Sequence, residues 1–92
     1  MTDFRIFETE QFQEDLKKIA RSGMPKLLDK LYAYVYPQLR SNPTTGANIK
    51  RLKGPYSDLW RYRIGAWRFF YQIEEKRRIV LMVAAAHRSS AY

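Results

Sequence analysis

The chain has 92 residues, no cysteine, one histidine and a formal net charge of +8 at pH 7. This length suits a single domain, residues 1–92, and the cysteine and histidine counts exclude a disulfide framework and a thiolate or histidine-rich metal site, so we expect no metal and no cofactor. No apolar stretch approaches the roughly 20 residues that span a bilayer, which favours a cytoplasmic protein.

The N-terminal part of the chain predicts a strand followed by two helices. Residues 3–7, DFRIF, alternate apolar and polar side chains, as a short strand does. Thr9 is suited to cap a helix that ends near Gly23, and a second helix is expected to begin at Pro25 and to end or kink at Pro37. Apolar residues recur at helical spacing in both, as Phe12, Leu16 and Ile19 in the first helix and as Leu27, Leu28, Leu31, Tyr34 and Val35 in the second.

Residues 40–48, RSNPTTGAN, concentrate turn-forming residues and predict a loop between two halves of one domain. The two halves differ in charge, because residues 1–39 carry six basic and six acidic side chains, whereas residues 40–92 carry eleven basic and three acidic ones. A polyanionic partner is therefore expected to bind the second half.

Three runs in the second half predict strands, at residues 59–64 (LWRYRI), 67–73 (WRFFYQI) and 78–86 (RIVLMVAAA). The joins between them are short, which predicts antiparallel hairpins. The order of the elements indicates an α+β fold, in which an N-terminal strand and a helical hairpin pack on a mainly antiparallel sheet of about four strands.

Alternation along these strands places arginines together on one face of the sheet. Arg61 and Arg63 lie on one side of their strand, and Arg68 lies opposite the apolar row of the next strand. If the helices cover the apolar rows, the three guanidinium groups converge on the open face, where phosphate can bind. The alternative is an ordinary solvated face, on which Arg61 or Arg63 pairs with Asp58 or Glu74.

Three segments together resemble the toxins of the RelE/ParE superfamily: IKRLKG at residues 49–54, LWRYRIGAWRFFYQI at 59–73 and HRSSAY at 87–92. The resemblance covers nearly the whole chain. It implies a toxin of a bacterial or archaeal type II toxin-antitoxin system, produced together with a small antitoxin. RelE-like members cleave messenger RNA in the ribosomal A site, whereas ParE-like members inhibit DNA gyrase.

The resemblance also implies roles for residues of the open face and the C-terminus. Arg61 and Arg63 stand where RelE-like toxins place two basic strand residues, often lysines, and Arg68 matches the arginine before the YQ strand. Tyr92 matches a C-terminal tyrosine that stacks on or acts at the scissile nucleotide, the alternative being a disordered final residue. There are two departures: Ala86 stands where some relatives carry a further arginine, and arginine in place of lysine weakens the case for proton abstraction.

RNA cleavage without a metal needs an activated 2′-hydroxyl, a stabilised phosphorane and a protonated 5′-oxygen. Arg61, Arg63 and Arg68 suit the second task, because guanidinium groups match the geometry of phosphate. His87 is the one side chain suited to acid–base work near neutral pH, with a strand-end histidine bonded to backbone as an equal alternative. The expected catalytic residues are thus Arg61, Arg63, Arg68, His87 and Tyr92.

A second set of basic residues is expected to bind RNA without taking part in the chemistry. Lys50, Arg51 and Lys53 in the segment NIKRLKG are expected to contact phosphates, Arg88 joins them, and Lys53 is also a candidate base. Phe70 on the arginine face either stacks on a base or packs in the core of the sheet, and packing is favoured.

Functions of three classes remain open: a ribosome-dependent endoribonuclease, a non-enzymatic gyrase inhibitor and a plain RNA-binding module. The arginines together with His87 and Tyr92 favour the first, since a toxin that only binds protein needs no acid–base group beside a phosphate site. The expected partners are a cognate acidic antitoxin, the ribosome and messenger RNA, with no membrane and no metal.

Overall fold

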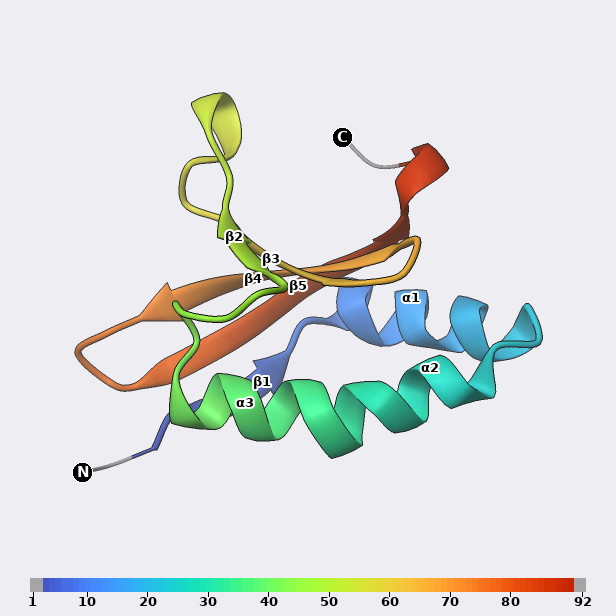
Figure 1. The fold of residues 1–92 in the computed structure, drawn as a ribbon, viewed down its shortest axis with the longest axis horizontal. Coiled ribbons are helices and arrows are strands. Elements are labelled where there is room, and N and C mark those ends of the chain that lie inside the picture. Colours follow the sequence, from blue (N-terminus) through green and yellow to red (C-terminus); the bar gives the residue numbers. More distant parts are fainter. Residues whose placement is uncertain (1–2, 91–92) are drawn as a thin grey trace.

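The computed structural model describes residues 3–90, which form a five-stranded sheet with helices on one face (Figure 1). The strands are β1 (Arg5–Glu8), β2 (Ile49–Arg51), β3 (Trp60–Ile64), β4 (Trp67–Glu74) and β5 (Ile79–His87). The helices are α1 (Glu10–Arg21), α2 (Pro25–Lys30) and α3 (Tyr36–Ser41), and a π-helical turn, Leu31–Val35, joins the last two. Short 3₁₀ turns occupy Gly54–Tyr56 and Arg88–Ser90.

The strand order is β1-β5-β4-β3-β2, so the first strand lies beside the last. β1 runs parallel to β5, and all other neighbouring strands are antiparallel. The predicted α+β fold, with a helical hairpin on a mainly antiparallel sheet, is therefore confirmed. The strand that the prediction did not contain is β2, which is three residues long.

The helix α1 forms as its sequence predicts. The Thr9 hydroxyl accepts a hydrogen bond from Phe12 N (3.1 Å) and so caps the helix. The apolar face of the helix is buried in the core. After α1, Gly23 adopts a φ of 86°, which a residue with a Cβ rarely does, and the chain turns back into α2.

The second helix differs from the prediction around Pro37. The interruption takes the form of the π-helical turn before the proline, and the helix continues beyond it through α3. A wider turn accommodates a residue that has no N–H to donate. Buried positions continue through this turn at a spacing of four residues, at Leu31, Val35 and Leu39. Tyr34, which we expected on the apolar side, is 70% exposed.

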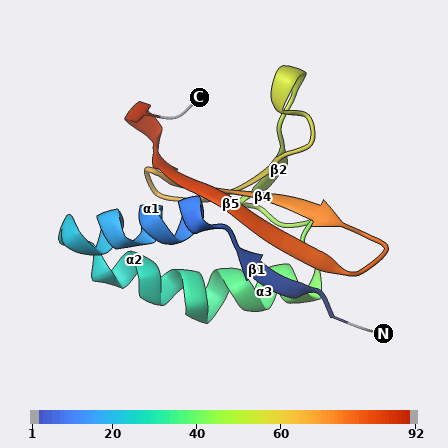
Figure 2. The same cartoon turned by 180° about the vertical axis from the view of Figure 1, so that it is seen from behind.

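The core lies between the helices and the covered face of the sheet. The Tyr71 hydroxyl donates to Pro43 O (2.6 Å) and the Tyr62 hydroxyl to Gln38 Oε1 (2.7 Å), so both buried rings are tied to the helical layer. Figure 2 shows the helices on one side of the sheet, with the turn after β2 and the segment after β5 rising from the other. Among residues 3–90, no helix combines the length and apolar character needed to cross a membrane.

Candidate functional site

The face of the sheet turned away from the helices carries the predicted arginines. In the β3–β4 pair, Arg63 is directly opposite Arg68, and Arg61 is opposite Phe70. Lys50 of β2 is in turn opposite Arg61. Side chains directly opposite each other in a sheet share a face, so these five lie together. Lys50, Arg61, Arg63 and Arg68 are referred to below as the cationic cluster.

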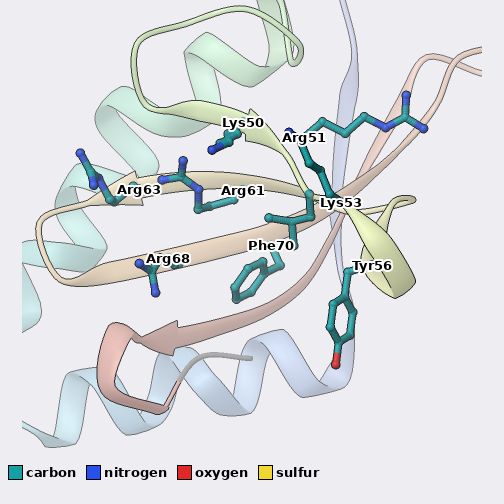
Figure 3. Close-up of a pocket in the computed structure, with 9 residues that line it drawn as sticks. Lys50, Arg51, Lys53, Tyr56, Arg61, Arg63, Arg68 and Phe70 are labelled. Carbon is teal, nitrogen blue, oxygen red and sulfur yellow. The ribbon is translucent and has the colours of Figure 1, made fainter.

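The cationic cluster lines a hollow of about 500 Å³ on this open face (Figure 3). The residues that line it are Lys50, Arg51, Leu52, Lys53, Tyr56, Arg61, Arg63, Arg68 and Phe70. None of these lining residues is acidic. The hollow therefore combines several fixed positive charges with two aromatic rings.

The carboxylates nearest in sequence to the cluster are bound elsewhere. Asp58 Oδ2 accepts a hydrogen bond from Gln72 Nε2 (3.0 Å), and Glu74 forms an ion pair with Arg77. Both carboxylates line a second hollow. Among the described residues, Asp58 and Glu74 therefore do not pair with Arg61 or Arg63, as the alternative of a solvated face had predicted.

Arg61 is affected by the like charges around it. Partial burial and the guanidinium groups of Arg63 and Arg68 lower the pKa of Arg61 below its ordinary value. The part of this shift that comes from Arg63 and Arg68 reflects repulsion between like charges. A phosphate bound among the guanidinium groups relieves that repulsion.

Phe70 forms part of the floor of the hollow. It is 3% exposed, yet it lies outside the main core cluster, because its cross-strand neighbours are Arg61 and Ala84 on the open face. The favoured prediction of a packed residue is met, but the packing takes place beneath the cations and not under the helices.

A β-bulge in β5 changes which side of the sheet the side chains at the end of this strand face. Consecutive residues of β4, Phe70 and Tyr71, pair with Ala84 and Met82, so Val83 is an extra residue in β5. Without the bulge, every second side chain after Met82 would point to the covered face, as the side chain of Met82 does. The bulge shifts this pattern by one residue.

His87 is the residue for which this shift has the largest consequence. It lies opposite Trp67, with the two ring centroids 5.3 Å apart and the rings at 86°. Its Nδ1 is 2.9 Å from Ser89 Oγ. Arg68 is paired with Ala86, and the side chains of this pair point to the side of the sheet opposite that of His87. We expected His87 beside the arginines, and the structure instead places its ring against Trp67.

The two predicted RNA-binding residues after Lys50 differ in where their side chains point. Lys53 lines the hollow near Phe70 (Figure 3). The guanidinium group of Arg51 points away from the cationic cluster. Its Nε donates to Ser57 O (2.9 Å), and its Cζ lies 5.8 Å from the centroid of the Trp60 ring.

The predicted residues of the C-terminal segment lie outside the hollow or outside the described residues. Arg88 is exposed in the 3₁₀ turn after β5, and its N donates to Ala66 O (2.7 Å). Tyr92 lies outside the described residues. Tyr56 was not among the predicted residues, yet it lines the hollow; the signal that marks it is an aromatic residue two positions after the basic segment IKRLKG.

The chain matches one known protein family and is similar in fold to several solved structures. Residues 6–92 match the family described as "ParE toxin of type II toxin-antitoxin system, parDE". The structure is similar to the RelBE2 toxin-antitoxin complex from Mycobacterium tuberculosis, with a TM-score of 0.71 and 17% identity over 94% of this chain and 99% of that one. It is similar to YafQ from E. coli, with a TM-score of 0.76 and 14% identity over 95% and 96% of the two chains.

A third similar structure is the archaeal RelE-RelB complex from Pyrococcus horikoshii, with a TM-score of 0.69 and 21% identity over 99% of this chain and 100% of that one. No curated protein sequence matches the chain significantly. At these identities the solved structures support the fold, and the family match covers nearly the whole chain.

Proposed function

The chain belongs to the RelE/ParE superfamily of toxins from type II toxin-antitoxin systems, and we propose that it is an endoribonuclease that cleaves messenger RNA in the ribosomal A site. The observation that carries the proposal is the cationic cluster, which gathers over three strands in a hollow whose lining residues include no carboxylate. Such a site fits the phosphate backbone of RNA. Cleavage there inhibits translation in the cytoplasm, and a cognate antitoxin is the partner that keeps the toxin inactive.

In the proposed reaction the 2′-oxygen attacks the adjacent phosphorus as its proton leaves, and the bond from phosphorus to O5′ breaks as O5′ gains a proton. The products are a 2′,3′-cyclic phosphate and a 5′-hydroxyl. Negative charge grows on the phosphorane oxygens, and Arg61, Arg63 and Arg68 stabilise it. Guanidinium groups stay protonated throughout, so their task is to hold the phosphate and not to move protons.

The two proton transfers need other groups. Lys53 lines the hollow and is placed to act on a nucleotide bound there. His87 and Tyr92 remain our proposals for the acid and base. An acid–base role for His87 requires its ring to turn away from Trp67 toward the open face.

The experiment that tests this function compares Arg68→Ala with Arg77→Ala, which removes the same charge from an exposed residue outside the hollow. We expect Arg68→Ala to slow cleavage of ribosome-bound message about 10²- to 10³-fold, because one donor to the transition-state charge is lost. Arg77→Ala is expected to cleave as the wild type does. Primer extension on translated messages measures both.

The second candidate function is inhibition of DNA gyrase, as ParE-like toxins perform. It is favoured by the placement of His87 on the side of the sheet opposite Arg68, which leaves the cationic cluster without an imidazole beside it. A gyrase supercoiling assay with the same purified protein distinguishes the two functions. Intact messages together with inhibited supercoiling would overturn the endoribonuclease proposal.

A further inference from the structure

Tyr56 stands at the wall of the hollow, and the proposed cleavage does not use it. It belongs to the 3₁₀ turn Gly54–Tyr56, which rises from the sheet after β2 on the side away from the helices (Figure 1). It lines the hollow and is 42% exposed. In Figure 3 the Phe70 ring lies between Arg68 and Tyr56.

The turn that carries Tyr56 is held by its own backbone. Ser57 N donates to Gly54 O (3.2 Å), and Leu59 N donates to Tyr56 O (2.9 Å). Gly54 has a φ of 68°, and the ring of Pro55 fixes the next φ. Because the turn is already formed, little conformational entropy is lost when a ligand contacts the tyrosine.

Arg51 supports this turn from the edge of the sheet. Its Nε donates to Ser57 O (2.9 Å), directly after the turn, while its guanidinium group lies over the Trp60 ring. Arg51 is paired with Trp60 in the β2–β3 register, and although the residue lines the hollow, its guanidinium group points away from the cationic cluster. The guanidinium group is therefore placed to hold the turn and not to bind a phosphate among the cluster.

We propose that Tyr56 stacks on a nucleobase of the RNA strand whose phosphates bind the cationic cluster, and that Arg51 is a positioning residue for the turn that presents Tyr56. This inference rests on the proposed function. A single strand of nucleic acid offers phosphates and planar bases in alternation, and the hollow offers cations for the first and an exposed ring for the second. Stacking of this kind recognises the presence of a base and tolerates its identity.

The test uses fluorescein-labelled 2′-O-methyl RNA decamers, which lack the nucleophilic hydroxyl, and a matched series in which one base at a time is replaced by an abasic unit. Anisotropy titration gives the affinity. Tyr56→Ala is expected to weaken binding roughly 5- to 150-fold with an unchanged salt dependence, because a base contact and no phosphate contact is lost. Tyr56→Phe is expected to bind within about twofold of the wild type, since stacking needs the ring and not the hydroxyl. Tyr34→Ala, at an exposed tyrosine of the helical layer, is the matched control.

The abasic series locates the partner base. At one position the abasic unit should weaken binding to the wild type and leave binding to Tyr56→Ala unchanged. Arg51→Lys keeps the charge but loses the contacts to Ser57 and Trp60, so it should weaken binding in the wild-type background and have no effect in the Tyr56→Ala background.

Three outcomes overturn parts of this inference. If Tyr56→Ala binds as the wild type while Arg68→Ala does not, Tyr56 has no stacking role and the proposed function stands. If Tyr56→Phe loses as much affinity as Tyr56→Ala, the hydroxyl makes the contact and stacking is wrong. If the wild type binds none of the decamers, the inference fails, whereas the proposed function is judged separately by cleavage of ribosome-bound message in Arg68→Ala and Arg77→Ala.

Discussion

The guanidinium group of Arg61 is held beside those of Arg63 and Arg68, although like charges repel. The register of β3 and β4 fixes this arrangement, and among residues 3–90 the lining of the hollow includes no carboxylate to offset it. Partial burial, followed by the charges of Arg63 and Arg68, lowers the pKa of Arg61. At the scale of single residues, the open face is therefore arranged for a ligand that brings negative charge, at some expense to the stability of the free protein.

The acid–base role proposed for His87 can be tested by substitution. If its imidazole moves a proton in the cleavage step, His87→Ala should slow single-turnover cleavage of ribosome-bound message about 10²- to 10⁴-fold. The rate measured across pH 5 to 9 should also lose the inflection that an imidazole produces, because no other side-chain type in this chain ordinarily changes charge in that range. An unchanged pH profile in the alanine variant assigns the proton transfer to Lys53, Tyr92 or the ribosome.

Hydrogen bonds connect the helix α1 and its N-cap to the backbone of β5 at the bulge. The Thr9 hydroxyl donates to Val83 O (2.9 Å), and Asp15 Oδ2 accepts a hydrogen bond from Ala85 N (2.9 Å). A bulge leaves backbone groups without partners in the ladder, and here two side chains of one helix satisfy them. These hydrogen bonds thus tie α1 to β5 at the bulge that decides which side of the sheet His87 faces.

Asp15 is expected to contribute to stability through this contact. Asp15→Ala leaves the partly buried N–H of Ala85 without its acceptor, which should lower the free energy of unfolding by about 1 to 3 kcal/mol. Glu14→Ala, one position earlier and exposed, should change it by less than about 0.5 kcal/mol. Urea unfolding monitored by circular dichroism measures both, and equal midpoints for Asp15→Ala and Glu14→Ala would contradict the role given to Asp15.

How far each element could be predicted depends on the length of its pattern. β3, β4 and β5 are runs of five or more residues, alternating in β3 and almost continuously apolar in β5, so their bounds were predicted to within a residue or two. β2 has three residues, too few to show a period. The bulge at Val83 has no signal in RIVLMVAAA, and the side chains that bond to the backbone there, Thr9 and Asp15, are distant in the sequence. The arginine face could therefore be predicted, and the orientation of His87 could not.

At the scale of the whole molecule, the open face of the sheet has two chemically different ends. One end is the hollow with the cationic cluster. The other is a second hollow, where Phe7, Ile79 and Leu81 lie with Asp58 and Glu74. Two of the three acidic residues of the basic half are thus placed away from the cations. A partner that covers the cationic end must bring acidic groups there.

We expect the cognate antitoxin to bind the open face through an acidic segment. Raising NaCl from 50 to 500 mM should then weaken the complex by roughly tenfold or more, mainly through slower association. Lys50→Glu in the cationic cluster should weaken it further, whereas Lys26→Glu on the helical layer should not. Surface plasmon resonance with the antitoxin measures both, and an affinity that ignores salt and Lys50→Glu would place the antitoxin elsewhere.

The pairing of the first strand with the last makes completion of the sheet depend on segments that are synthesised far apart in time. Thr9 and Val83, which are hydrogen-bonded across that junction, are 74 positions apart in the chain. Contacts between such distant segments form late, and β1 has no other strand to pair with. A nascent chain that has not yet released β5 therefore leaves β1 and α1 undocked. The surface of the sheet is therefore complete only once β5, Ile79–His87, has joined β1.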